Sequence, residues 1–144
     1  MSSARGVLLD TGPIYGLLEG RDQYHAQARA LFGQLEAEGV AIHMAYPALS
    51  EAHRLLLTRA GSDVQRAHER VTALFDFASV RYAVEDDGKA ARTTLGRFGD
   101  QKITLTDATI AAMAVREGMQ VATFDARHFG LMGASVYELG DGAA

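Results

Sequence analysis

An apolar run that ends in an acid, Val7-Leu8-Leu9-Asp10, decides how this chain folds. Three consecutive apolar residues are typical of a strand buried on both faces of a parallel sheet, because a strand with one exposed face alternates apolar and polar residues. We therefore expect residues 6–10 to form the first strand of a sheet that helices cover on both sides.

Beyond this strand, helical and strand-like patterns alternate along the chain. Helices are predicted where apolar residues recur three and four positions apart, and glycine or proline marks several of their ends. The expected helices cover residues 22–38, 47–60, 62–75, 85–98 and 106–117, and the expected strands cover residues 40–44, 79–84, 120–124 and a short 135–139. Gly12 and Pro13 indicate a break after the first strand.

The third predicted helix forms a hairpin with the second. Ser62 and Gln65 predict a capping box at its start. Its apolar residues are expected to turn inward, namely Val64, Ala67, Val71, Leu74 and Phe75.

Strands that alternate with helices predict a three-layer α/β domain with a mostly parallel central sheet. Right-handed crossovers restrict the topology of such a sheet, and its ligands bind at the carboxyl ends of the strands. With 144 residues and 48% hydrophobic content the chain can bury one sizeable core, so we expect a single domain over residues 1–144. Nothing in residues 140–144 favours an ordered structure.

The composition bears on location and on partners. The absence of cysteine excludes disulfides and thiolate sites. The chain has no stretch resembling a signal peptide and no apolar run of roughly 18 residues, which predicts a cytoplasmic protein without a membrane span. The net charge of −4 counts against a large basic surface for nucleic acid, although carboxylates that bind a cation would contribute negative charge of their own.

Two aspartates fall where predicted strands end. Asp10 closes the first strand and Asp125 directly follows the fourth, so both should lie at the sheet edge where ligands bind. Each could instead be a turn residue whose carboxylate accepts hydrogen bonds from backbone amides.

Two further acids lie on helix faces that should point inward. Glu51 shares a face with Ala52, and Asp107 shares one with Ile110. Glutamate is rarely buried unless it is paired or binds a metal. The competing interpretations are an ion pair between Glu51 and Arg54, and a capping role for Asp107 at its helix start.

Together, the four acids would converge at one edge of the sheet. Carboxylates so close repel one another, and they are tolerated only with raised pKa values or a bound cation. Oxygen ligands without cysteine or an obvious histidine pair suit Mg²⁺ or Mn²⁺. The sequence therefore predicts a metal site.

These acids and their neighbours resemble the PIN-domain family, in particular the VapC-type toxins of bacterial toxin-antitoxin pairs. The resemblance covers essentially the whole chain and rests on four motifs: Leu9-Asp10-Thr11-Gly12-Pro13, Ser50-Glu51, Leu105-Thr106-Asp107-Ala108, and Ala122-Thr123-Phe124-Asp125 followed by Arg127, His128 and Phe129. It implies a strand order of 3-2-1-4-5, a homodimer, a divalent metal and cleavage of RNA.

The resemblance also implies roles for individual residues. By position, Asp10 and Asp107 would be the principal metal ligands, and Glu51 and Asp125 would act directly or through water. All four acidic positions of the family are occupied in this chain.

Other residues match the family less specifically. Thr11 and Thr123 resemble its hydroxyl residues, which would orient a carboxylate or a metal-bound water. Asp100 matches a further acidic position of the family, although a loop aspartate more often has a structural role. Among the basic residues Arg127 is the candidate for an RNA contact, and His128 is expected to pack or cap beside Phe129.

The expected activity is metal-assisted hydrolysis of RNA phosphodiester bonds by the toxin of a type II pair, with a small antitoxin inserting a helix or an arm beside the acids. Two alternatives stay open: a PIN nuclease in RNA processing without an antitoxin, and a non-catalytic RNA- or protein-binding module. The string Leu9-Asp10-Thr11-Gly12 also resembles the active-site turn of a dimeric aspartic protease. Those proteases are all-β, whereas this chain is rich in helical patterns.

Overall fold

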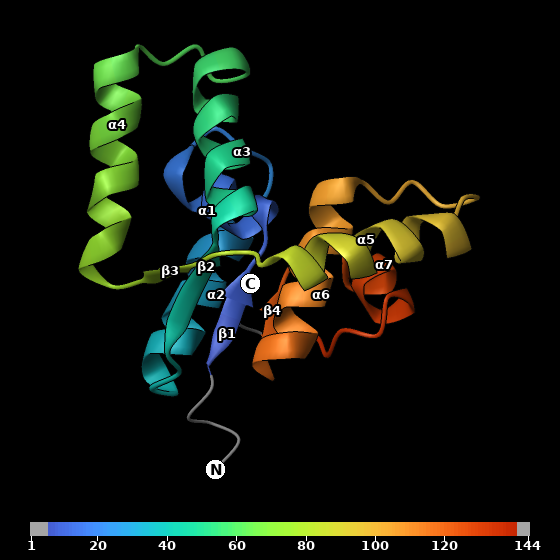
Figure 1. The fold of residues 1–144 in the computed structure, drawn as a ribbon. Helices are drawn as coiled ribbons and strands as arrows, with labels where there is room; N and C mark the ends of the chain where they lie inside the picture. The colour runs from blue at the N-terminus through green and yellow to red at the C-terminus, as the bar shows by residue number, and fades with distance from the viewer. Residues whose placement is uncertain (1–5, 141–144) are drawn as a thin grey trace.

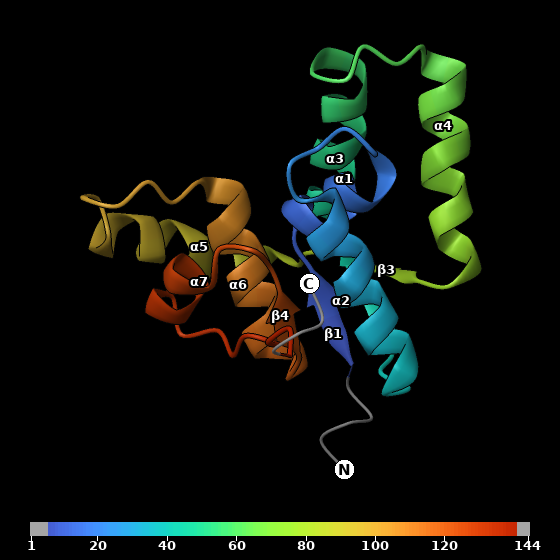
Figure 2. The same ribbon diagram turned by 180° about the vertical axis from the view of Figure 1, so that it is seen from behind.

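A computed structural model describes residues 6–140 of the chain. Strands and helices alternate in the order β1 (Val7–Leu9), α1 (Thr11–Leu18), α2 (His25–Ala37), β2 (Ile42–Ala45), α3 (Tyr46–Thr58), α4 (Val64–Ala73), the 3₁₀ helix η2 (Leu74–Asp76), β3 (Ser79–Arg81), α5 (Glu85–Arg97), α6 (Leu105–Glu117), β4 (Gln120–Ala122) and α7 (Ala126–Leu131). Figures 1 and 2 show these elements from opposite sides. The predicted lack of order falls, apart from Gly140, on residues 141–144, which lie outside the described part of the chain.

The central sheet has the strand order β3-β2-β1-β4, and each neighbouring pair is parallel. This confirms the predicted three-layer α/β fold and the first four positions of the expected strand order. The predicted fifth strand, residues 135–139, is reduced to a single parallel bridge between Val121 and Val136. The side-chain amide of Gln34 explains the difference, because it donates to the Glu138 carbonyl and its oxygen accepts from the Gly140 N–H. These bonds draw the backbone toward α2 and away from the sheet edge.

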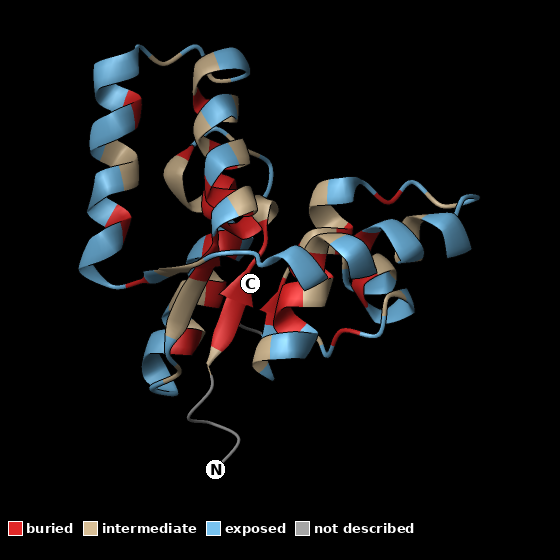
Figure 3. Ribbon diagram, viewed as in Figure 1, coloured by how far each residue is buried: buried red, intermediate tan, exposed pale blue. Residues whose placement is uncertain are grey.

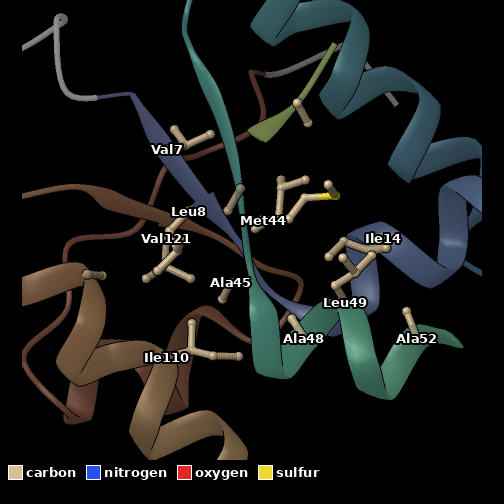
Figure 4. Packing of buried hydrophobic residues seen from close by; sticks show 14 of the residues in the cluster. Val7, Leu8, Ile14, Met44, Ala45, Ala48, Leu49, Ala52, Ile110 and Val121 are labelled. Atoms are coloured by element: carbon tan, nitrogen blue, oxygen red, sulfur yellow. The ribbon is translucent and has the colours of Figure 1, made fainter. Parts of the chain in front are cut away.

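The core lies on both sides of β1, whose three residues are fully buried. Leu8 lies toward Ile110 of α6, whereas Met44 of β2 lies toward Ile14 of α1 and Leu49 of α3 (Figure 4). Alternate side chains of the central strands therefore serve two helical layers, which is why the apolar run at residues 7–9 does not alternate with polar residues.

Helix α1 departs from the predicted break after β1. Gly12 and Pro13 lie in its first turn, where the N–H that proline lacks would have no helical partner in any case. Ile14 and Tyr15 are buried against the core, which adds tertiary packing to a short segment. The six-residue helix α7 was also not expected, because a single short turn carries too little periodicity to detect.

The predicted helical hairpin is confirmed as α3 and α4, which stand beyond the sheet in Figure 1. The predicted cap was wrong: Asp63 accepts from the Arg66 N–H at 2.8 Å, while the Ser62 hydroxyl donates to the Asp63 carbonyl. Only part of the predicted inward face is buried, since Val64 is 69% exposed and Phe75 is 51% exposed. Helix α4 is otherwise largely exposed in Figure 3, and Ala67 is its one buried residue.

The predicted strands 79–84 and 120–124 run longer than the observed β3 and β4. The residues that follow each strand turn away at the carboxyl edge of the sheet. Within residues 6–140, no helix combines the length and the apolar character that crossing a membrane requires.

Candidate active site

Asp10 lies directly after β1 and is 7% exposed. Its backbone N–H donates to the Ala122 carbonyl of β4, which fixes the residue between the two strands. Its Oδ2 accepts a hydrogen bond of 2.8 Å from the Thr123 hydroxyl, whereas its Oδ1 is buried without a hydrogen-bond partner. The turn interpretation is therefore insufficient, because a capping aspartate would accept from the amides of α1, and no such side-chain cap is formed.

The environment of Asp10 disfavours its charged form. The pKa of Asp10 is raised to about 7, mainly by burial and to a smaller extent by the carboxylates of Asp107 and Glu51. The nearby Thr11 backbone amide and the hydrogen bond from the Thr123 hydroxyl favour the charged form and act in the opposite direction. An oxygen that is buried, unpartnered and surrounded by like charge is a position where a cation would be stabilised.

Asp107 lies in the first turn of α6 and both caps the helix and faces the other acids. Thr104 and Asp107 form a capping box, in which the Asp107 N–H donates to the Thr104 hydroxyl and Asp107 Oδ2 accepts from the Thr104 N–H. Burial, followed by the charges of Asp125 and Glu51, raises the pKa of Asp107. Asp107 therefore has the predicted capping role, with Thr104 as its partner, and also faces the other acids.

Glu51 projects from α3 and is held at both oxygens. The Thr11 hydroxyl donates to its Oε1 at 2.8 Å, and Arg54 Nη2 lies 3.9 Å from its Oε2. The expected ion pair with Arg54 therefore exists but is long, and the side chain of Glu51 is 36% exposed. The short hydrogen bond joins α3 to the first residue of α1.

Asp125 does not directly follow β4, which ends at Ala122. It is instead the N-cap of α7. Its Oδ1 accepts from the His128 N–H, and its Oδ2 lies 2.8 Å from His128 Nδ1. Thr123 connects it to Asp10, because the hydroxyl that donates to Asp10 also accepts from the Asp125 N–H at 2.9 Å. Asp125 thus caps α7 by accepting from the His128 N–H, and the His128 ring lies against the same carboxylate.

The four acids lie at the carboxyl edge of the sheet, where Asp107 and Glu51 act on the charge of Asp10, and Asp125 and Glu51 act on that of Asp107. As the side chains lie here, no three histidine or acidic groups in the described range 6–140 are close enough to hold one ion together. The donors nevertheless fit a hard divalent cation: they are all carboxylate oxygens, one of them is buried without a partner, and Glu51 and Asp125 are exposed enough to reorient.

A family model for the PIN domain matches residues 7–132. The chain belongs to the PIN domain family. The matched region contains all four acids and both threonines, so the convergence described above lies wholly inside this PIN domain. No curated protein matches the sequence.

Solved structures similar to this PIN domain include VapC20 of Mycobacterium tuberculosis, described as a toxin that cleaves the sarcin-ricin loop. It is 24% identical over 92% of this chain and 98% of its own, with a TM-score of 0.73. VapBC2 of Rickettsia felis, described as bound to a DNA fragment from its promoter, is 17% identical over 92% and 96%, with a TM-score of 0.68. FitAcB of Neisseria gonorrhoeae is 20% identical over 92% and 96%, with a TM-score of 0.55. At these identities the likeness is one of fold.

The less specific candidates lie at the rim of this PIN domain. Arg127 Nη1 donates to Gln101 Oε1 in the loop between α5 and α6, and the amide of Gln101 contacts Asp100. Both contacts are exposed, and neither involves Asp10, Glu51, Asp107 or Asp125. Thr104 is the supporting residue that sequence reasoning passed over, although a threonine three positions before an acid is a readable signal of a capping box.

Proposed function

We propose that this PIN-domain chain is a divalent-metal-dependent endoribonuclease and the toxin of a type II toxin-antitoxin pair. The observation that carries the proposal is the buried, unpartnered Oδ1 of Asp10 among three further carboxylates at the edge where α/β folds bind ligands. The description of VapC20 as a sarcin-ricin loop cleaving toxin supports an RNA-cleaving toxin, as does the fold that the two proteins share.

Asp10 and Asp107 would be the principal ligands of Mg²⁺ or Mn²⁺, and Glu51 and Asp125 would bind directly or through water. When bound, such an ion lowers the pKa of a coordinated water and neutralises charge on the scissile phosphate. Thr123 holds Oδ2 of Asp10, which leaves Oδ1 available to the site. Thr11 fixes Glu51 in the same way, and a carboxylate of this set would accept the proton of the attacking water.

The partners belong to the same proposal. We propose a single catalytic domain over residues 1–144, a cytoplasmic homodimer, and inhibition by a small antitoxin beside the acids. The similarity to VapBC2, described with promoter DNA, supports the toxin-antitoxin context. A small open reading frame adjacent to this one and encoding a DNA-binding protein would favour it. Without such a neighbour, the alternative of a PIN nuclease in RNA processing would use the same site.

Cleavage of a mixed RNA substrate tests the activity. The purified protein should cleave with Mg²⁺ or Mn²⁺ and not with EDTA, and Asp10→Asn should lower the rate roughly 100- to 10,000-fold while the fold is kept. Asp76→Asn is the matched control, because Asp76 is an exposed aspartate of η2, which precedes β3 and so lies toward the opposite edge of the sheet. Unchanged cleavage by Asp10→Asn, or none by the folded, metal-loaded protein, would favour a non-catalytic binding module. The aspartic-protease interpretation is excluded by the parallel α/β sheet.

A further inference from the structure

Two tyrosines form an exposed stacked pair that the proposed chemistry does not use. The rings of Tyr46 and Tyr82 lie 5.2 Å apart between centroids, with an interplanar angle of 27°. Tyr46 is 48% exposed and Tyr82 is 64% exposed, so the pair contributes little to the core. The exposed stacked rings present a flat apolar face to which a planar ligand could bind.

The pair lies at the same sheet edge as the acids. Tyr46 directly follows β2 and Tyr82 directly follows β3, just as Asp10 directly follows β1. These three strands are parallel neighbours, so their carboxyl ends meet at one edge, with β3 about 10 Å from β1. In Figure 1 the segment that leaves β3 crosses in front of the start of α3.

The backbone beneath Tyr82 is held in place. Arg116 of α6 donates to the Tyr82 carbonyl at 3.4 Å. Its guanidinium is fixed in turn by Asp87 of α5, which is 2% exposed and accepts at 3.0 and 3.2 Å from Arg116 Nε. A rigid, exposed aromatic face of this kind is preorganised for a flat ligand.

A second stacked pair provides a contrast. Tyr24 and Phe124 lie 5.3 Å apart between centroids, but Phe124 is packed against the core and covered by Tyr24. That pair has a structural role in holding α2 against the loop that carries Asp125. The Tyr46–Tyr82 pair has no comparable core contact.

The charge distribution indicates what ligand the exposed pair takes. Acidic residues outnumber lysine and arginine, 18 to 14, and at least six of those basic side chains form ion pairs with a carboxylate. These ion pairs and the net charge of −4 reduce what the basic side chains can contribute to binding phosphates, which normally supply much of the affinity for nucleic acid. Stacking of bases on aromatic rings is the other general source of affinity for single strands, and it does not need a basic surface.

We infer that the Tyr46–Tyr82 pair is a stacking platform for an unpaired base of the RNA substrate, next to the scissile phosphate at the acids. The substrate class is then single-stranded or looped RNA with a base that can leave its stack, because paired bases present no free face. This inference rests on the proposed ribonuclease function and specifies the substrate of that same site.

Fluorescence of a single tryptophan tests the platform independently of cleavage. The chain contains no tryptophan, so Tyr82→Trp introduces one indole that keeps an aromatic ring in the pair. The probes are an oligoribonucleotide and an abasic strand of the same length, mixed with protein and Mg²⁺ in a stopped-flow instrument and read before products accumulate. We expect the base-containing strand to quench the indole and the abasic strand, with the same phosphates, to leave it unchanged.

Phe75→Trp is the matched control, since Phe75 is 51% exposed in η2, at the opposite end of β3. No quenching at position 82, or equal quenching at both positions, would overturn the inference. Quenching by the abasic strand equal to that by the base-containing strand would also overturn it, because the contact would then be to phosphates. Loss of cleavage in the Asp10 variant is measured separately, so failure of the nuclease and failure of the platform give different patterns.

Steady-state kinetics provide a second readout. Tyr82→Ala should raise KM for single-stranded RNA roughly tenfold with little change in kcat, and Tyr82→Phe should retain the wild-type KM because the ring is kept. Sedimentation of Tyr82→Ala tests the alternative that a second copy of this chain covers the pair. A lowered oligomeric state with an unchanged KM would assign the pair to an interface between two copies of this chain and overturn the inference.

Discussion

Asp10 carries the electrostatic cost of the site. The pKa of its carboxyl rises from 3.8 to about 7 in the folded protein, chiefly because the side chain is buried. Between these two values the folded protein binds more protons at Asp10 than the unfolded chain does, so the free energy of unfolding falls as the pH rises through this range. Above pH 7 the full cost is present, up to about 4 kcal/mol for a shift from 3.8 to about 7.

This cost predicts a pH-dependent gain in stability on removal of the charge. In EDTA, Asp10→Asn should have a higher free energy of unfolding than the wild type at pH 8, and the difference should shrink as the pH falls toward 4. Urea unfolding at several pH values measures it, with Asp76→Asn as a control that changes little. A difference that is the same at pH 4 and pH 8 would show that Asp10 is not destabilised by its charge in the native state.

The positions of the acids were readable from the sequence, but their partners were not. Asp10 and Asp107 are marked by local patterns, a strand end and a helix start. The hydrogen bonds that define the site join Thr11 to Glu51 and Thr123 to Asp10, which are 40 and 113 positions apart. Such contacts depend on the sheet order and on side-chain rotamers, which no local pattern encodes.

At the scale of the elements, one buried acid ties the α3–α4 hairpin to the rest of the fold. Glu19, just after α1, is 6% exposed and accepts from Arg21 Nε at 2.6 Å, while Arg70 of α4 lies 3.5 Å away. Arg21 also donates to the Ala60 carbonyl at the hairpin tip. The hydrogen bond from Arg21 is the main cause of the lowered pKa of Glu19.

Removing this charge should loosen the hairpin. Glu19→Gln is expected to lower the free energy of unfolding at pH 7 by roughly 1–2 kcal/mol, discounted because Arg21 is largely exposed. Faster hydrogen exchange of the α4 amides would locate the effect. Glu85→Gln is the control, since Glu85 and Lys89 form an exposed pair on α5 and their loss should be nearly neutral. Equal effects of the two substitutions would contradict a tethering role for Glu19.

The elements were predictable where packing agrees with local propensity. The buried strand β1 and the alanine-rich helix α6, closed by Gly118 in the left-handed conformation, follow from pattern alone. Helix α1 did not, because the break suggested by Gly12 and Pro13 is overridden by burial of Ile14. The prediction of a fifth strand was wrong because of a tertiary contact: the side chain of Gln34 binds the Glu138 carbonyl and the Gly140 N–H.

For the whole molecule, the net charge of −4 is compatible with RNA cleavage only if the acidic edge is neutralised and affinity has a source other than basic residues. The four acids and the stacked tyrosines lie at that one edge. A divalent ion would relieve the repulsion that raises the pKa of Asp10, so binding of the ion should stabilise the folded protein as well as activate it.

The most direct measurement of the central claim is calorimetric titration of Mn²⁺ into the wild type, Asp10→Asn and Asp76→Asn, with thermal unfolding of each at saturating ion. We predict binding to the wild type and to Asp76→Asn, with a rise in Tm for both, and loss of binding and of the rise in Asp10→Asn. Absence of binding to the folded wild type, or equal binding by all three proteins, would contradict a metal site built on Asp10.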